Sequence, residues 1–260
     1  MPSGNYFYER HPALKILILA ALKQEIKYLV KELGARSGGE GDWLARSGKT
    51  EAAIVLTGMG VANATVRTAS ALLVHRPSLV ISAGFAGALY EGAEYGELIC
   101  PETAFLHPKP PGSPTTPDSI GLCGPRFKDF FAVVSKGKSA KRGSIVTLSE
   151  WIEKPALKDS PAAGLQYPVC DMETFPVAGA ALKSGAEFLA LRSITDRADE
   201  EIGISPMDIA DTKGQISIRL AAGRFASNPH LIPRAIKFGR SSDKAARALA
   251  SALKEFLMSL

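Results

Sequence analysis

Val169-Cys-Asp-Met-Glu-Thr and Leu191-Arg-Ser-Ile-Thr-Asp-Arg-Ala-Asp are the two ends of the stretch that decides the fold. Between them, residues 172–183 are rich in Ala, Val and Leu, which predicts a buried helix. Residues 188–194 form a short apolar run that predicts a buried strand. The stretch is therefore a helix followed by a strand, the repeating unit of α/β proteins.

Three carboxylates, Asp171, Glu173 and Asp196, lie at the junctions of this unit. Asp196 falls just past the carboxyl end of the predicted strand, where open α/β sheets bind their ligands. Glu173 falls in the first turn of the predicted helix, beside backbone N–H groups that favour negative charge. Two acids delivered to one crevice predict polar, acid-assisted chemistry on a small molecule.

The rest of the chain repeats the alternation. A buried strand is predicted at 14–21 and a helix with apolar spacing at 22–33, and later segments continue the pattern without a linker. We therefore expect one α/β domain over residues 1–260 with a mixed or parallel sheet. Residues 1–13 are polar and are expected to form a flexible extension.

Composition excludes several classes. The chain is 46% hydrophobic over 260 residues, enough for a large core. We see no apolar run of the ~18 residues that a membrane span needs and no signal peptide, so a cytoplasmic location is expected. The three cysteines and four histidines are scattered, which predicts neither disulfides nor a metal site, and no cofactor is expected.

The positive charge is local. The net charge is +5, but residues 214–260 carry eight Lys/Arg against two Asp/Glu, leaving 23 basic and 24 acidic residues elsewhere. This distribution argues against a nucleic-acid partner. The helix expected from Ser241 has Lys244, Arg247 and Lys254 alongside Leu249, Leu253 and Leu257. It fits either a peripheral membrane contact or an ordinary helix packed on the sheet.

Four blocks in order carry a resemblance. They begin at Lys15 (Lys-Ile-Leu-Ile-Leu-Ala-Ala-Leu-Lys-Gln-Glu-Ile), Thr57 (Thr-Gly-Met-Gly-Val-Ala-Asn-Ala) and Val80 (Val-Ile-Ser-Ala-Gly-Phe-Ala-Gly-Ala-Leu), and the fourth joins Asp171-Met-Glu to Ile194-Thr-Asp. The set resembles the nucleoside phosphorylase/nucleosidase superfamily, on the side of the methylthioadenosine/S-adenosylhomocysteine nucleosidases. The resemblance implies a three-layer α/β/α domain with a central mixed sheet, a nucleoside substrate and a homo-oligomer, most often a dimer.

The C-terminal part narrows the resemblance. Gly214-Gln-Ile-Ser-Ile-Arg-Leu-Ala, Asn228-Pro-His-Leu-Ile-Pro and Phe238-Gly-Arg-Ser-Ser-Asp-Lys are similar to the hopanoid-biosynthesis-associated branch. That branch is thought to remove adenine from adenosylhopane, a lipid-linked nucleoside.

The family reaction assigns roles to the acids. Asp196 matches the general acid that protonates the purine N7, and the acidic run 199–201 is expected to raise its pKa. Glu173 matches the residue that binds the ribose hydroxyls, with Met172 packing on the sugar. Glu25 matches the carboxylate that activates the attacking water. Without the resemblance, Asp196 fits a turn cap, Glu173 a helix-end charge and Glu25 an ordinary polar-face residue.

Four further residues match the substrate pocket. The segment from Gly84 to Gly87 is expected to be a turn that lets backbone approach the ligand. The family often has Ser or Thr where Phe85 stands, so Phe85 either covers the sugar or an apolar substituent, or belongs to the core. Trp151 and Ile152 match the segment that sandwiches the base, although a structural turn explains them nearly as well.

Whether water or phosphate is the attacking nucleophile depends on whether the site has arginines that bind phosphate. Related phosphorylases carry one in the opening loop and one before the glycine turn, where this chain has Ala20-Ala21-Leu22 and Ile81-Ser82-Ala83. Hydrolysis of an adenosyl or 5′-modified adenosine compound is therefore preferred. Arg192 and Arg197 reverse that preference if either points inward. A phosphorylase and a non-catalytic nucleoside-binding protein are the alternatives.

Overall fold

The computed structural model describes residues 14–39, 41–47, 50–108, 119–157, 160–161, 164–200 and 205–260. The expected extension at residues 1–13 lies outside this part of the chain. The described strands form one mixed sheet in the order β10-β6-β8-β9-β5-β1-β4-β3-β2, with β7 on β6. The strands are β1 (Leu14–Ala20), β2 (Arg36–Gly39), β3 (Asp42–Ser47), β4 (Thr50–Leu56), β5 (Leu79–Ala88), β6 (Leu98–His107), β7 (Ser119–Gly121), β8 (Ala140–Leu148), β9 (Pro168–Asp171) and β10 (Glu187–Asp196).

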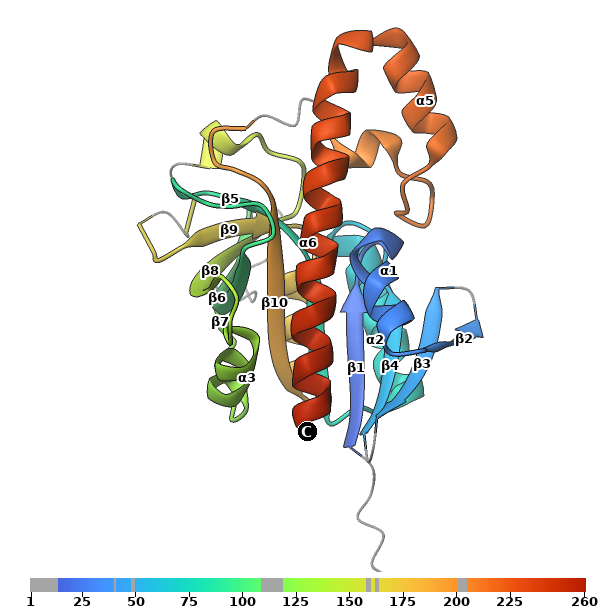
Figure 1. The fold of residues 1–260 in the computed structure, drawn as a ribbon, viewed down its shortest axis with the longest axis vertical. Helices are drawn as coiled ribbons and strands as arrows, with labels where there is room; N and C mark the ends of the chain where they lie inside the picture. The colour runs from blue at the N-terminus through green and yellow to red at the C-terminus, as the bar shows by residue number, and fades with distance from the viewer. Residues whose placement is uncertain are drawn as a thin grey trace, which may run out of the picture.

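Helices cover both faces of this sheet (Figure 1). Strand β10 also pairs with β5 in parallel, which closes β5, β9, β8, β6 and β10 into a ring. The structure thus confirms a mixed α/β sheet between helical layers. The helices are α1 (Lys23–Glu32), α2 (Val61–His75), α3 (Phe127–Val134), α4 (Thr174–Lys183), α5 (Ile218–Ser227) and α6 (Ile232–Ser259), with short 3₁₀ turns η1 (Lys154–Leu157), η2 (Pro206–Ile209) and η3 (Pro229–Leu231).

Strand β1 shows why the sheet needs two helical layers. Its buried side chains alternate between two clusters because successive residues of a strand point to opposite faces. Ile16 and Ile18 pack with residues of α1, α3 and α6, whereas Leu17 and Leu19 pack with residues of α2 and α4. An apolar run with both faces buried is the pattern of a central strand in an α/β protein.

Residues 169–199, the stretch that decides the fold, adopt nearly the predicted structure. The helix begins at Thr174 rather than at residue 172, because the Asp171 carboxylate accepts a hydrogen bond from the Thr174 N–H at 2.9 Å. Glu173 is consequently the residue before the helix and not part of its first turn. Asp196 is the last residue of β10 rather than the first beyond it.

The glycine segment was predicted wrongly as a turn. Residues 84–87 continue β5, and Gly84 and Gly87 stand opposite Arg192 and Asp196 of β10. The close approach itself is present. A Cβ on Gly84 would lie 2.6 Å from Glu25 Oε1, and one on Gly87 would lie 2.7 Å from Asp196 Oδ2. The glycines therefore make room for protein carboxylates, not for a chain reversal.

The C-terminal helices also differ from expectation. The sequence analysis expects a helix from Ser241, yet α6 begins at Ile232 and runs unbroken through Gly239. A glycine inside a helix costs about 1 kcal/mol relative to alanine. Burying a leucine gains about 1.5–3 kcal/mol, and α6 buries Leu249, Leu253 and Leu257. The buried stripe outweighs the glycine.

Residues 205–240, which we call the cap, extend beyond the sheet (Figure 1). The cap consists of η2, α5, η3 and the first turns of α6. Gln215 joins it to the body by donating to the Ala21 carbonyl at 2.7 Å, and the Gly214 carbonyl accepts from the Met59 N–H at 3.0 Å. Among the described residues, none of the helices combines the length and apolarity needed to cross a membrane.

Candidate active site

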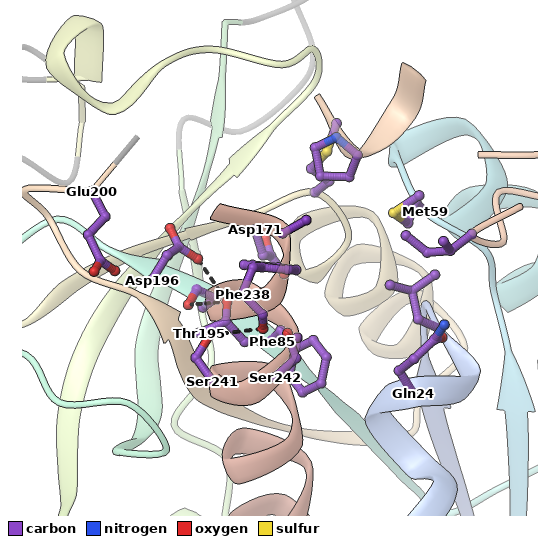
Figure 2. A pocket seen from close by; sticks show the side chains of 18 of the residues that line it. Gln24, Met59, Phe85, Asp171, Thr195, Asp196, Glu200, Phe238, Ser241 and Ser242 are labelled. Atoms are coloured by element: carbon purple, nitrogen blue, oxygen red, sulfur yellow. Dashed lines mark hydrogen bonds between the residues drawn. The ribbon is translucent and has the colours of Figure 1, made fainter. Parts of the chain in front are cut away.

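A cavity of about 750 Å³ lies where the carboxyl ends of β5 and β10 meet the start of α1 and the cap (Figure 2). Its size is typical of a pocket for a small organic ligand. The structure brings nearly all the sequence-predicted site residues to this one cavity. The predicted residues that line it are Glu25, Phe85, Trp151, Ile152, Met172, Glu173 and Asp196. Gly84 lies just behind, at a second and much smaller cavity.

Glu25 is held by backbone donors at the base of the cavity. It is 5% exposed, and its carboxylate accepts the Leu22 N–H at 2.7 Å and the Phe85 N–H at 2.8 Å. Burial raises the pKa of Glu25 above its ordinary value, although these two hydrogen bonds act in the opposite direction. A carboxylate with a raised pKa and a fixed orientation is suited to accept a proton from water.

Glu173 reaches the same region from the start of α4. Its Oε1 accepts the Gly60 N–H at 2.7 Å, which links it to the first turn of α2. Burial, together with the nearby charges of Asp171 and Glu25, raises the pKa of Glu173 to about 8. The negative charge of Glu25 thus disfavours the charge of Glu173. A positive charge that developed between them would favour ionisation of both.

Asp196 has a partner that the sequence did not reveal. Its Oδ2 forms an ion pair with Lys154 of η1, and its Oδ1 accepts the Thr195 hydroxyl at 2.8 Å. The expectation that the acidic run acts on Asp196 stays a prediction, and the described residues of the run have other partners. The Oδ1 atom of Asp199 lies 3.9 Å from the Nε atom of Arg197. Glu201 lies outside the described part of the chain.

Glu200 likewise turns away from Asp196. It accepts hydrogen bonds from the Tyr95 hydroxyl and from the Lys237 ammonium group of the cap. Burial alone would raise the pKa of Glu200, but these bonds outweigh it and lower the pKa to about 2. Glu200 is thus a stable anion that ties the cap to the body.

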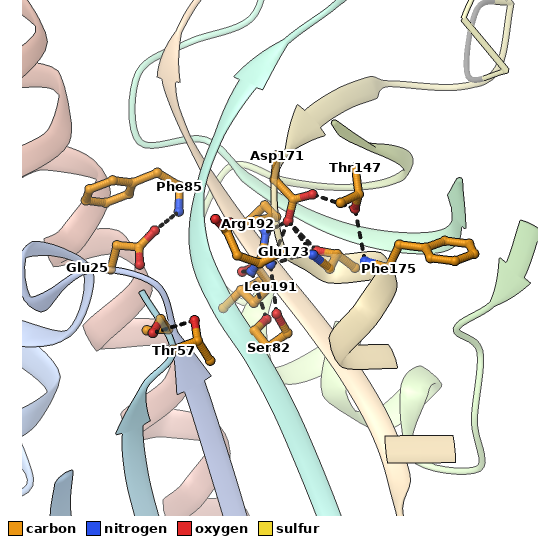
Figure 3. A network of polar contacts seen from close by, with 12 residues as sticks. Glu25, Thr57, Ser82, Phe85, Thr147, Asp171, Glu173, Phe175, Leu191 and Arg192 are labelled. Atoms are coloured by element: carbon orange, nitrogen blue, oxygen red, sulfur yellow. Dashed lines mark hydrogen bonds and ion pairs between the residues drawn. The ribbon is translucent and has the colours of Figure 1, made fainter. Parts of the chain in front are cut away.

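Arg192 does point inward, but protein atoms occupy its donors (Figure 3). Its Nε and Nη2 donate to the Asp171 carboxylate at 3.1 and 2.9 Å. Nη1 donates to the carbonyls of Ser82 and Leu191, both at 3.0 Å, and Nη2 also donates to the hydroxyls of Ser82 and Thr174. All five N–H bonds of the guanidinium group therefore have acceptors.

The small second cavity adjoins this arginine. It measures about 10 Å³ and is lined by Ser82, Gly84, Glu173, Arg192 and Glu25, among others. This is about the volume that one water molecule needs and is too small for phosphate. The exposed Arg197 instead stacks on Tyr95 with its guanidinium carbon 5.2 Å from the ring centre. Neither arginine is arranged to hold phosphate, so the preference for water stands.

The roles of Asp171 and Lys154 in the site were not predicted from the sequence. Asp171 accepts from Arg192, from Thr174 and from the Thr147 hydroxyl at 2.7 Å, so it fixes the helix start and the arginine together. Its place in the Asp-Met-Glu block was a usable signal. Lys154 carried no signal, because it is a lone lysine in a segment predicted as loop.

The base-covering segment and the cap form the remaining walls. Ile152 and Met172 pack on the apolar cluster around Val146 and Leu148, and Trp151 is half-buried at the rim. Phe85 packs at the edge of the sheet core and also lines the cavity, so its role toward a ligand stays a prediction. The cap adds a mainly apolar wall that the sequence analysis did not predict. This wall includes Pro206, Ile209, Ile216, Ala221, Phe225, Leu231 and Phe238.

Fold and site together define an α/β protein that binds a small molecule among carboxylates at the ends of its parallel strands. The chain belongs to the phosphorylase superfamily, whose family model matches residues 15–257. A 5′-methylthioadenosine/S-adenosylhomocysteine nucleosidase of Exiguobacterium sp. is 25% identical over 219 residues, covering 76% of this chain and 92% of that protein. The corresponding nucleosidase of Geobacillus kaustophilus is 26% identical over 228 residues, covering 80% and 94%.

Solved structures agree on the fold. The futalosine hydrolase of Helicobacter pylori superposes with a TM-score of 0.73 at 20% identity, covering 95% of this chain and 99% of that one. The Neisseria meningitidis 5′-methylthioadenosine/S-adenosylhomocysteine nucleosidase, in complex with methylthio-immucillin-A, superposes with a TM-score of 0.71 at 18% identity, covering 95% and 100%.

Proposed function

We propose that this protein is a purine nucleosidase that hydrolyses the N-glycosidic bond of an adenosyl or 5′-modified adenosine compound and releases adenine. The observation that carries the proposal is the convergence of Glu25, Glu173 and Asp196 on one cavity. The names of the relatives support the same reaction class. The saturated Arg192 and the water-sized cavity beside it favour water over phosphate.

Each step of such a reaction can be assigned to a residue that lines the cavity. The purine occupies the end of the cavity at Asp196, between Trp151 and Ile152, and Asp196 gives a proton to N7. The electron pair of the N9–C1′ bond leaves with the purine, and the ribose becomes oxocarbenium-like. Glu173 binds the ribose hydroxyls and balances the developing charge. Water attacks C1′, and Glu25 takes its proton.

The apolar wall of the cap leads us to propose a large apolar 5′ substituent, with adenosylhopane as the specific candidate. Ala221 and Phe225 lie one turn apart on α5 and face the cavity, and Ile209 and Leu231 flank them. A methylthio group is small, whereas this wall extends along η2, α5 and η3. Apolar burial contributes about 0.8 kcal/mol per CH₂. A longer 5′ chain therefore binds more tightly as it extends along this wall.

A series of 5′-alkylthioadenosines tests both parts of this proposal. We expect free adenine, detected by chromatography, in phosphate-free buffer. We expect kcat/KM to rise by about four-fold per added methylene over the first members. Phe225→Ser reduces the gain for long chains and leaves 5′-methylthioadenosine turnover near wild type. Leu220→Ser, on the same helix but 45% exposed and outside the cavity lining, is the matched control.

Three results would count against the proposal in different ways. Binding without adenine from every adenosyl substrate supports the non-catalytic alternative. Adenine released only with added phosphate supports the phosphorylase alternative. Adenine released equally from short and long chains removes the large 5′ substituent but keeps the nucleosidase.

We further propose that a cytoplasmic enzyme meets such a substrate at the membrane surface, through the cap. The helix predicted for this contact does not provide it, because Leu249, Leu253 and Leu257 are buried in the core. One group of exposed apolar side chains lies instead in the cap. They are Met207, Ile218, Leu220, Ile232 and Ile236, with the Ile218 residue 86% exposed. Arg219, Arg234 and Arg240 lie among them and would complement anionic headgroups.

Liposome sedimentation tests the membrane contact. We expect the protein to pellet with vesicles that contain phosphatidylserine, and to pellet less with neutral vesicles or at high salt. Ile218→Ser combined with Ile236→Ser should weaken pelleting, whereas Leu73→Ser on the distant helix α2 should not. Equal recovery of the wild type in the supernatant with both vesicle types would contradict the contact.

A homodimer is the assembly that we propose from the family resemblance. Exposed Val66, Leu73 and Val74 on α2, with Leu182 on α4, offer an apolar face away from the cap. Light scattering that gives the mass of a single chain would contradict it.

A further inference from the structure

Lys154 forms a buried ion pair at the acid end of the cavity. Its side chain is 11% exposed and that of Asp196 is 8% exposed. The Lys154 ammonium group also donates to the Arg197 carbonyl at 2.5 Å, just beyond the end of β10. Removing two opposite charges from water costs free energy that their attraction offsets only partly, so such a pair is weak evidence for a purely stabilising role.

The backbone is shaped around this pair. A Cβ on Gly87 would lie 2.7 Å from Asp196 Oδ2 and 3.0 Å from Lys154 Cε. Any other residue at position 87 would push the carboxylate and the lysine stem out of place. Gly87 of β5, Asp196 of β10 and Lys154 of η1 therefore form one close-packed unit, and all three line the cavity.

The hydrogen bonds show which form of Asp196 this unit holds. Both carboxylate oxygens are acceptors, Oδ1 of the Thr195 hydroxyl and Oδ2 of Lys154. Contacts of this kind, from a hydroxyl and an ammonium group, suit the carboxylate form that a general acid takes when its proton leaves. An ammonium group beside the carboxylate stabilises the negative charge that appears as the proton leaves.

We propose that Lys154 is a positioning residue for the proton transfer from Asp196, an inference that rests on the proposed nucleosidase function. Lys154 orients Asp196 and stabilises its carboxylate while the proton passes from Oδ2 to the purine N7. The N9–C1′ bond breaks with its electron pair on the purine. The water oxygen bonds to C1′ and its proton passes to Glu25. One water is consumed, and exchange with solvent returns Asp196 and Glu25 to their starting forms.

Steady-state kinetics of three variants test this role, with adenine release from the best 5′-alkylthioadenosine as the assay. Lys154→Met keeps the length of the side chain and removes its charge. We expect kcat to fall roughly 10- to 100-fold with KM changed less than about three-fold, a part of the 10²–10⁴ that a general acid contributes. Lys154→Arg keeps the charge and should recover most of the loss. Lys138→Met removes an ion pair with Glu255 outside the cavity, at 2.6 Å, and should match wild type.

The split between kcat and KM separates this role from a structural one. A wild-type value of kcat in Lys154→Met overturns the proposal. An equal loss of kcat in Lys154→Met and Lys154→Arg, together with a lowered melting temperature in both variants, overturns it as well. If Lys154→Met fails to fold, Lys154→Gln replaces it, with the same expected loss of kcat. A wild-type protein that releases no adenine would instead refute the proposed function itself.

Discussion

Asp196→Asn is expected to lower kcat by roughly 10²–10⁴-fold while substrate binding persists. Asparagine has nearly the same shape, and its single oxygen keeps one of the two contacts that Thr195 and Lys154 make to separate carboxylate oxygens, but it has no acidic proton to give to N7. The purine must then leave as an anion, which is a poor leaving group. Rapid-quench measurement of adenine formation gives the chemical step, and calorimetry with the uncleaved nucleoside gives the affinity.

Asp129→Asn is the matched control for this prediction. Asp129 lies on α3 with an exposed side chain and is not part of the cavity lining. Its substitution should leave kcat within about two-fold of wild type, as is usual for a surface change. Asp196→Asn turning over at the wild-type rate would remove Asp196 from the role of general acid.

Glu25→Gln should have an effect of similar size, roughly 10²–10⁴-fold on kcat, because it removes the base that takes the proton of the attacking water. The amide has a single oxygen, so it accepts only one of the Leu22 and Phe85 N–H groups, which bind separate carboxylate oxygens of Glu25, and a loss of about 1–3 kcal/mol of stability is expected beside the loss of kcat. Glu32→Gln is the control, since Glu32 lies on the same helix, half exposed, 3.6 Å from Lys254.

The same residue predicts the pH dependence of the wild type. Water activation needs ionised Glu25, and burial raises the pKa of Glu25 while that of its neighbour Glu173 is raised to about 8. Protonation of either carboxylate lowers activity, so kcat/KM should fall as the pH drops through the neutral range. An ordinary surface carboxylate would give this decline only near pH 4. A pH profile that stays flat down to pH 5 would contradict the roles of both glutamates.

The sequence predicted the elements whose signal is local. The strand predicted at 14–21 and the helix predicted at 22–33 follow from burial on one or both faces, and the position of Asp196 follows from the end of such an apolar run. The segment 84–87 was misjudged because glycine indicates a turn locally, whereas here its pairing with β10 decides its conformation. Long-range pairing of this kind cannot be inferred from a single stretch.

The walls of the site were harder to predict than its acids. Lys154 meets Asp196 across more than forty positions of sequence, and nothing near Lys154 indicates a buried charge. The part of the cap wall that lies on α5 is only a short pair, Ala221 and Phe225, on a helix that is otherwise exposed. Its apolar spacing is too brief to distinguish a cavity wall from an ordinary amphipathic helix.

A crystal structure with a non-hydrolysable 5′-alkylthio adenosine analogue tests the central claim most directly. The account predicts the purine N7 within hydrogen-bond distance of Asp196, the ribose hydroxyls at Glu173, C1′ facing Glu25 and the alkyl chain along the cap wall. An analogue bound elsewhere, or bound here with its base away from Asp196, would contradict it.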